Sequence, residues 1–148
     1  MNLRSHNFYL SFLIFFIFFF YTSCSYLEDD SLVFENPYIN LPSIGQNSAS
    51  GYLLISNRSK DFYSLSNINC EGIRKTVFHK SERDPDTDII SMVEINEIVI
   101  APNKDLNLIP GSTHLMLMGI EKVMELGGSV HCSFFDGNQK HLVIFKIK

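Results

Sequence analysis

Short apolar runs separated by turn residues are the feature that most constrains the fold of this chain. The breaks between the runs carry residues that favour turns, such as Pro102-Asn103 and Gly127-Gly128, and Asp136-Gly137 is a strong hairpin signal. Only residues 120–126 could hold helical turns, and that stretch is short. The pattern therefore predicts an all-β sandwich of about seven or eight strands. The seven clearest runs are residues 51–57, 62–68, 73–80, 89–95, 114–119, 129–135 and 141–147.

The N-terminus has the composition of a secretory signal. Arg4 precedes an uncharged apolar run, Phe8 to Tyr21, which is shorter than a transmembrane helix normally needs. Small residues then precede Cys24, which is the arrangement of a bacterial lipoprotein cleavage site, although Tyr21 departs from that pattern. Three outcomes stay open for residues 1–24: lipoprotein cleavage with a lipid anchor on Cys24, ordinary cleavage near residues 23–25, or an uncleaved anchor. All three predict a periplasmic or other extracytoplasmic location.

The remainder of the chain is long enough for one domain. Without the 24-residue leader it has 124 residues, with 11 basic and 16 acidic side chains. We expect residues 25–47 to be a linker with an edge segment near Leu32 to Phe34, and residues 48–148 to be the functional domain. The acidic balance and the lack of a Lys/Arg cluster argue against nucleic acid or an anionic membrane surface as partners. We expect a monomer, attached to a membrane only through a lipid on Cys24.

Two cysteines remain after the leader, Cys70 and Cys132. In an oxidising compartment they could form one disulfide. The alternation of Val130, Cys132 and Phe134 instead favours an inward-facing strand on which the thiol is a small buried apolar group. We favour two buried thiols, and the disulfide stays open as the alternative.

Motifs of hydrolytic and redox enzymes are absent from the sequence. There is no Gly-rich phosphate loop, Gly-x-Ser-x-Gly, His-Glu-x-x-His or Cys-x-x-Cys motif. The acidic stretch 82–88, ERDPDTD, lacks the glycine and the final glutamate of a calcium loop, so we interpret it as an exposed turn. The protein is therefore not predicted to be an enzyme.

Histidine and methionine have an unusual placement in the sequence. In the stretch PGSTHLMLMG, residues 110–119, a strand would put His114 and Met116 on one face and the intervening leucines on the other. His79 ends an earlier strand-like run, and Met92 lies in the next one. Two imidazoles and two thioethers form a soft donor set, which favours Cu(I) over zinc, calcium or magnesium.

These residues resemble the metal motif of the periplasmic PCu(A)C copper chaperones. Twelve residues separate His79 from Met92, and twenty-one separate Met92 from His114-Leu115-Met116. The stretches SGYLLISN and PGSTHLMLMG are also similar to the family's sequence. The resemblance extends from about residue 49 to residue 148. Lys80 replaces an optional methionine of the motif, and the Met- and His-rich tail of some members is missing. We therefore expect one copper site.

The resemblance implies a cupredoxin-like, Greek-key β-sandwich that acts as an extracytoplasmic copper chaperone. It implies that His79, Met92, His114 and Met116 bind one Cu(I). The implied acceptor is the dinuclear copper centre of cytochrome c oxidase, reached directly or together with a thiol-containing copper chaperone. Met118 shares a nominal strand face with Met116, and we assign it a supporting or packing role.

The two remaining histidines, His131 and His141, match no ligand position, so we expect them to face solvent. Two rival functions stay open. A blue-copper electron carrier needs a thiolate with two histidines, and neither Cys70 nor Cys132 lies in the motif. A metal-free Ig-like binding module would use its loops to hold a protein partner. Copper titration and the absorption spectrum of the copper-loaded protein separate the three functions.

Overall fold

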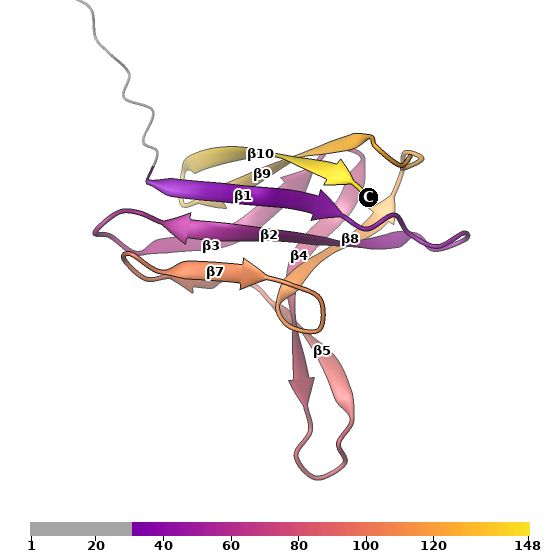
Figure 1. Ribbon diagram of the computed structural model, residues 1–148, viewed down its shortest axis with the longest axis horizontal. Helices are drawn as coiled ribbons and strands as arrows, with labels where there is room; N and C mark the ends of the chain where they lie inside the picture. The colour runs from indigo at the N-terminus through magenta and orange to yellow at the C-terminus, as the bar shows by residue number, and fades with distance from the viewer. Residues whose placement is uncertain (1–30) are drawn as a thin grey trace, which may run out of the picture.

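Residues 31–148, which the computed structural model describes, form ten strands hydrogen-bonded into one sheet (Figure 1). Within this range no segment is helical, and so none offers a helix able to span a membrane. The strands are β1 (Leu32–Ile39), β2 (Ser48–Asn57), β3 (Tyr63–Cys70), β4 (Ile73–Arg83), β5 (Ile90–Ile95), β6 (Ile98–Ile100), β7 (Asp105–Leu108), β8 (His114–Ile120), β9 (Ser129–Asp136) and β10 (Gln139–Ile147).

The all-β prediction is confirmed, and each of the seven predicted runs contributes one strand. The structure adds β6 and β7, with three and four residues, which are too short to show a clear alternation of apolar and polar positions. The predicted signal and lipoprotein site in residues 1–24 lie outside the described residues.

The sheet closes on itself like a barrel. Its strands follow the order β5-β4-β8-β2-β1-β10-β9-β3-β6, with β7 paired to β2. One further pairing, Ile68 with Thr76, joins β3 to β4 and closes the ring. Most neighbouring strands are antiparallel, whereas β1 and β10 run parallel. Strands far apart in the sequence thereby become neighbours, including β4 and β8.

The segment interpreted as a linker and edge supplies β1. This strand pairs with β2 along most of its length, whereas only Tyr38 and Ile39 pair with β10. Its first half is therefore hydrogen-bonded on one side only, as an edge segment would be. Leu32 and Ile39 nevertheless lie in the hydrophobic core. The packed unit thus includes this strand as well as residues 48–148.

Large apolar side chains fill the inside of the barrel. Phe78, Phe134 and Phe145 are almost completely buried, and the rings of Phe134 and Phe145 stack with their centres 6.3 Å apart. Leu115 and Leu117 on β8 are completely buried beside them in the same cluster. Burial of these side chains is the main source of stability in such a fold.

Cys70 and Cys132 form a disulfide, which corrects the expectation of two free buried thiols. They are direct neighbours on β3 and β9, with Cα atoms 4.0 Å apart, and both are buried. The inward orientation of Cys132 was predicted correctly. The position of Cys70 opposite Cys132 could not be predicted from the sequence, because it depends on which strands pair.

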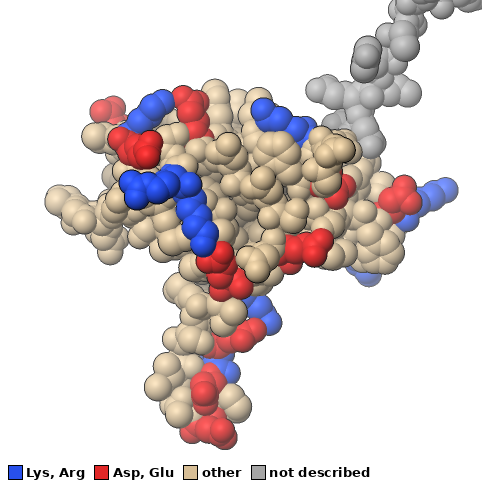
Figure 2. Space-filling view, turned by 180° about the vertical axis from the view of Figure 1, so that it is seen from behind, with Lys and Arg blue, Asp and Glu red and all other residues tan. Residues whose placement is uncertain are grey.

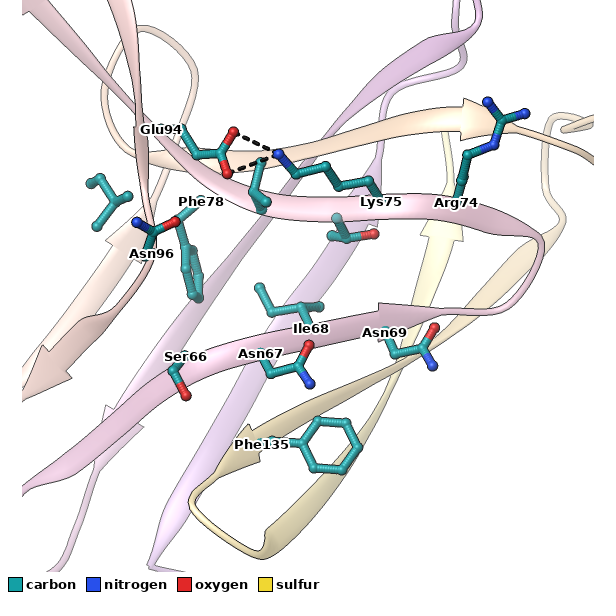
Figure 3. A pocket seen from close by; sticks show the side chains of 13 residues that line it. Ser66, Asn67, Ile68, Asn69, Arg74, Lys75, Phe78, Glu94, Asn96 and Phe135 are labelled. Atoms are coloured by element: carbon teal, nitrogen blue, oxygen red, sulfur yellow. Dashed lines mark hydrogen bonds and ion pairs between the residues drawn. The ribbon is translucent and has the colours of Figure 1, made fainter.

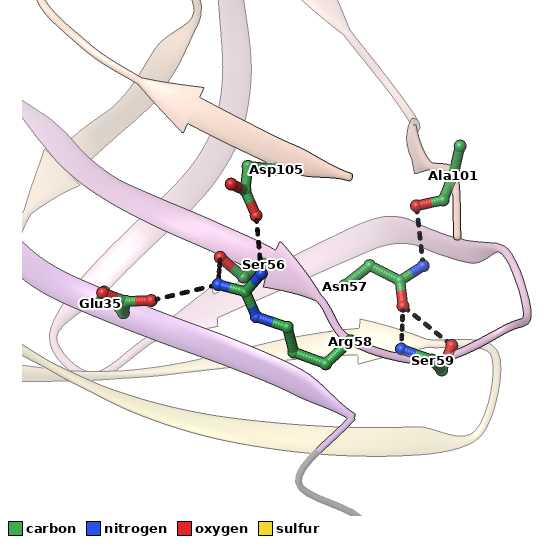
Figure 4. Close-up of polar contacts among 7 residues, drawn as sticks. All are labelled: Glu35, Ser56, Asn57, Arg58, Ser59, Ala101 and Asp105. Carbon is green, nitrogen blue, oxygen red and sulfur yellow. Dashed lines mark hydrogen bonds and ion pairs between the residues drawn. The ribbon is translucent and has the colours of Figure 1, made fainter. Parts of the chain in front are cut away.

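A polar cluster holds the loops at the end of β2 (Figure 4). The Asn57 side chain is fully buried, and its amide donates to the carbonyl oxygens of Asp61, Ile100 and Ala101 at 2.8–3.1 Å. Its carbonyl oxygen accepts from the backbone and hydroxyl of Ser59. These bonds satisfy a polar group that would otherwise destabilise the core.

The β4–β5 hairpin projects away from the barrel (Figure 1). The first half of β4 pairs with β8, whereas its second half, from Phe78 to Arg83, pairs with β5. The turn of this hairpin carries the acidic stretch 82–88, which is exposed along its whole length, as predicted. The Asp84 carboxylate accepts the backbone N–H groups of Asp86 and Thr87, and these bonds lower the pKa of Asp84.

Candidate copper site

Three neighbouring strands, β5, β4 and β8, bring the predicted ligands to one face of the sheet. His79 on β4 lies directly opposite His114 on β8. Met116 follows two residues later on β8, opposite Val77. Met92 on β5 lies opposite Ser81, which is two residues after His79. Because directly opposed residues point to the same side of a sheet, all four predicted ligands share that side.

The alternation along β4 and β8 identifies this side as the outer one. Phe78, Leu115 and Leu117 point into the core. Successive side chains of a strand point to opposite faces, so His79, next to Phe78, and His114, next to Leu115, point outward. The alternation that buries the core residues therefore places both imidazoles on the outer face, where His79 is half-buried and His114 is almost completely covered.

The two imidazoles face one another. Their ring centres lie 6.0 Å apart, and the rings are nearly perpendicular. Metal–imidazole nitrogen distances are about 2.0–2.1 Å for zinc, so this separation leaves room for one ion between the rings. His114 Nδ1 lies 3.0 Å from the carbonyl oxygen of Ser112. When Nδ1 donates this hydrogen bond, Nε2 of His114 keeps a free lone pair for a metal.

His79 provides the structural observation that best fits a metal ligand. Its Nδ1 atom is buried and has no hydrogen-bond partner. Buried polar atoms are nearly always paired, and an unpaired imidazole nitrogen beside a second imidazole is what a metal ion would satisfy. Burial and the neighbouring charge of His114 lower the pKa of His79, so this ring favours its neutral, metal-binding form.

The two methionines lie at different depths. Met116 is half-buried beside the imidazole pair, whereas the Met92 side chain is 62% exposed on the projecting hairpin. The structure thus groups His79, His114 and Met116 closely and places Met92 one strand further out, on the solvent side.

Met118 lies two positions beyond Met116, opposite Lys75 on β4 and Ser48 on β2. The next residue, Gly119, has a φ of +69°, and a Cβ atom there would lie 2.8 Å from Cβ of Arg74. A side chain at position 119 would therefore clash, which explains the glycine. The chain leaves regular strand geometry just after Met118.

Four neighbours of the site were not singled out by the sequence analysis. The Tyr52 ring centre lies 6.2 Å from that of His114, and Tyr38 packs on Tyr52 at 5.1 Å. Glu94 lies opposite His79, and Lys75 binds Glu94. Tyr52 belongs to the stretch SGYLLISN, so the resemblance to the family could have identified it as a neighbour of the site. Glu94 and Lys75 can be identified as neighbours only from the strand register.

The remaining histidines lie elsewhere. His131 is exposed, as expected, and lies 4.0 Å from a carboxylate oxygen of Glu71. His141 does not face solvent freely, which corrects the expectation: it is half-buried, with ring contacts to Phe34 and Tyr63. Among residues 31–148, no three His, Cys, Asp or Glu side chains gather in a way that could hold a metal. In this arrangement, a metal site among these residues therefore also needs methionine sulfur.

A cavity of about 540 Å³ opens between β3 and the β4–β5 hairpin (Figure 3). Polar side chains such as Asn67, Asn69 and Asn96 line much of it. None of the four predicted ligands lines this cavity, although Lys75 and Glu94 do. The imidazole pair lies outside this cavity, with His79 half-buried and His114 buried.

Comparison with known proteins gives a family and a fold. The family described as "Putative lipoprotein LpqE-like" matches residues 32–146. The "Uncharacterized protein RP573" of Rickettsia prowazekii (strain Madrid E) is 30% identical over 113 residues, which cover 75% of this chain. This chain spans 61% of the length of that relative.

Two solved structures have a similar fold. The "Copper-bound PCuAC domain from PmoF2" superimposes with a TM-score of 0.67 at 18% identity, covering 80% of this chain and 92% of that domain. The solution structure of "CuI-DR1885" from Deinococcus radiodurans gives a TM-score of 0.60 at 17% identity, covering 78% of this chain and 76% of that one. The predicted likeness to this group is confirmed in the fold. The chain belongs to the LpqE-like family, and its ten-stranded fold is that of the PCuAC domains.

Proposed function

We propose that this protein is an extracytoplasmic copper chaperone that carries one Cu(I) on His79, Met92, His114 and Met116. The observation that carries the proposal is the facing pair of imidazoles, in which the Nδ1 atom of His79 is buried without a partner. The two solved structures of the same fold are a copper-bound and a Cu(I) form, which supports copper as the cargo.

The donor set suits a carrier of Cu(I). Thioether sulfur and neutral imidazole nitrogen bind this soft ion well. Both ligands are neutral, so copper can be bound and released without the loss or gain of a proton. Both cysteines of the described range form the buried disulfide, so neither can supply a thiolate ligand. A blue-copper centre, which needs a thiolate ligand, is therefore disfavoured here.

The position of Met92 suggests how copper leaves. This thioether lies on the projecting hairpin and is the most exposed of the four ligands, so an incoming acceptor would replace it first. His79 and Met116 would be exchanged next, and His114, held by the Ser112 carbonyl, last. Stepwise replacement avoids releasing a bare ion into water.

The acceptor we propose is the dinuclear copper centre of cytochrome c oxidase, reached directly or together with a thiol-containing copper chaperone. Acidic side chains gather on the projecting hairpin around Glu82, Asp84, Asp86 and Asp88 (Figure 2). This arm would favour a partner with a basic surface around its copper site. The signal expected in residues 1–24 and the lipoprotein description of the family support an extracytoplasmic location, with a lipid on Cys24 as the proposed anchor.

The proposal is tested by anaerobic Cu(I) competition titrations of the four single alanine variants. Each is expected to weaken Cu(I) binding at least about tenfold, since even residues that only support a ligand cost 10–100-fold in metal affinity when mutated. Met118→Ala and His131→Ala are the matched controls, with an expected change below about twofold. X-ray absorption of the loaded protein should detect two sulfur and two nitrogen donors.

If none of the four variants weakens binding, copper is not held here, and the metal-free binding module is the better interpretation. If Met118→Ala costs as much as Met116→Ala, the ligand set must be extended to Met118. An intense blue absorption of the Cu(II) form would support an electron carrier instead.

A further inference from the structure

Glu94 is a charged oxygen donor placed at the edge of the imidazole pair. It lies directly opposite His79 on β5, two residues after Met92, and so shares the outer face with both. Directly opposed residues of an antiparallel pair have Cα atoms about 4.5–5.5 Å apart. A carboxylate at this position can reach the same side of His79 as an ion bound between the two imidazoles.

Lys75 holds this carboxylate by both oxygens. Its Nζ atom donates to Oε1 and Oε2 of Glu94 at 2.9 and 2.8 Å. Lys75 precedes His79 by four residues on β4, so it lies on the same face and reaches Glu94 past Val77. Figure 3 shows the pair on the side of β4 opposite to Phe78, which points into the barrel.

The charges of this pair act on His79. The Glu94 carboxylate raises the pKa of His79, and the Lys75 ammonium lowers it, although burial and His114 have larger effects in the lowering direction. Both charged groups are therefore near enough to influence the chemistry of the predicted ligand. The pair is also solvent-exposed, at 53% for Lys75 and 38% for Glu94, and exposed ion pairs of this kind contribute little to stability.

The two oxidation states of copper differ in the ligands they prefer. Cu(I) is satisfied by thioether sulfur, whereas Cu(II) prefers imidazole nitrogen and carboxylate oxygen in a tetragonal arrangement. Two histidines and one carboxylate on neighbouring strands supply such donors only after Glu94 has left Lys75. While Lys75 holds both oxygens of Glu94, no three His or acidic side chains of residues 31–148 gather closely enough to hold a metal. The Glu94 carboxylate is available to Cu(II) even though Lys75 binds it, because breaking an exposed ion pair costs little free energy.

Building on the proposed function, we propose that Glu94 becomes a ligand when the bound ion is Cu(II), and that Lys75 holds it aside when the ion is Cu(I). The hydrogen bonds from Lys75 to Glu94 break, a carboxylate oxygen binds copper, and the ammonium group returns to water. No electron or proton is transferred in this exchange. The site would then hold Cu(II) with nitrogen and oxygen, and Cu(I) with nitrogen and sulfur.

The hairpin contains a matched control pair. Lys80 binds Glu82 at 3.1 Å, and both side chains are about half exposed, like Lys75 and Glu94. Even-numbered positions of β4 point to the side opposite His79, so this pair lies on the other face of the hairpin. Glu82→Gln removes the same charge from the same element without touching the site.

The experiment compares the wild-type protein with Glu94→Gln, Glu82→Gln and Lys75→Gln, each titrated with Cu(II) alone and, anaerobically, with Cu(I). Glu94→Gln should weaken Cu(II) binding at least about tenfold and change the electron paramagnetic resonance spectrum of the Cu(II) form. Glu82→Gln should change neither. Lys75→Gln should strengthen Cu(II) binding, because it frees the carboxylate. Cu(I) affinity should change by less than about twofold in all three variants.

Glu94→Asp is a second variant that keeps the charge and shortens the side chain, and it should give an intermediate Cu(II) affinity with an altered spectrum. The inference is overturned if Glu94→Gln and wild type have the same Cu(II) affinity and spectrum, or if Glu82→Gln has the same effect as Glu94→Gln. Failure of the wild-type protein to bind Cu(I) would instead overturn the proposed function. The parallel Cu(I) titration therefore separates the two failures.

Discussion

The barrel around β3 and β9 and the projecting β4–β5 hairpin differ in nearly every physical property. Cys70, Cys132 and Phe134 are buried in the barrel, where a disulfide and stacked rings connect the strands. On the hairpin, Ile90 and Met92 are largely exposed, and no residue of β5 is fully buried. Stability thus comes mainly from the barrel, whereas the proposed ligands lie where β4 and β8 of the barrel meet the hairpin, with Met92 on the hairpin itself.

β4 connects the two regions and belongs to both. Phe78 points into the barrel, and the next residue, His79, points to the outer face. A shift of one residue in the pairing of β4 with β8 would send the imidazole inward and the phenyl ring outward. Burial of Phe78 therefore also fixes the position of His79.

The largest effect is expected for Phe134→Ala in the barrel. The Phe134 ring contacts the rings of Phe34, Phe78 and Phe145 at centre distances of 5.2–6.4 Å. Its removal should lower the free energy of unfolding by about 3–5 kcal/mol through lost burial and a new cavity. Urea denaturation of the copper-free protein measures this loss.

The exposed Phe62→Ala is the control for Phe134→Ala, with an expected change within about 0.5 kcal/mol. The folded fraction of Phe134→Ala should retain its Cu(I) affinity. A loss of copper binding in protein that is still folded would mean that barrel and site are not separate.

The second largest effect concerns the disulfide. The double variant Cys70→Ala, Cys132→Ala opens a link between residues 62 positions apart, and it should lower the free energy of unfolding by about 2–4 kcal/mol. Denaturation of this variant and of wild type under reducing conditions should agree. Cu(I) affinity should be unchanged, and a substantially altered affinity would show that the disulfide positions the ligands.

The fold was largely predictable because alternation and turn chemistry are local signals. The runs at residues 51–57 and 129–135 reveal strands in their own sequence. β6 and β7 are too short to do so, and the disulfide was interpreted wrongly because only Cys132 had a recognisable inward pattern. Pairing of Cys70 with Cys132 depends on β3 lying beside β9, which is a property of the whole sheet.

The candidate site was predictable only where a motif spacing could be compared with a family. His79 and His114 are 35 residues apart in sequence, and their contact depends on the register of β4 against β8. Glu94 and Lys75 carry no such spacing signal, since charged residues on a hairpin normally contact only solvent. Their relation to His79 requires the register of β5 against β4 as well.

A smaller effect is expected on the hairpin, for Met92→Ala. Because this side chain is exposed, the free energy of unfolding should change by no more than about 0.5 kcal/mol. Its Cu(I) affinity should nevertheless fall about tenfold, or about 1.4 kcal/mol in binding free energy. Val93→Ala, the neighbour on the opposite face, should change neither quantity. A clear destabilisation by Met92→Ala would contradict the separation of stability and binding.

The smallest expected effect is a shift of the pKa of His79 in the copper-free protein. It is measured from the NMR signals of the imidazole as the pH is varied. His79 should titrate below its ordinary value of 6.5 because burial and the charge of His114 disfavour the imidazolium. The variant His114→Asn removes that charge and should raise the pKa of His79 again. A pKa of His79 at or above 6.5 in wild type would contradict the burial of this ring.

Because the pKa of His79 is lowered, its effect on stability and on copper binding falls at acidic pH. A histidine whose pKa is lowered by folding stabilises the folded state at pH values above its ordinary pKa, and this contribution is lost as the pH falls through the lowered value. The neutral imidazole is also the form that binds a metal. Between the lowered and the ordinary pKa, His79 therefore stays neutral and ready for copper at an acidity that would already protonate an exposed histidine, while the same shift makes the folded state less stable as the pH falls through this window.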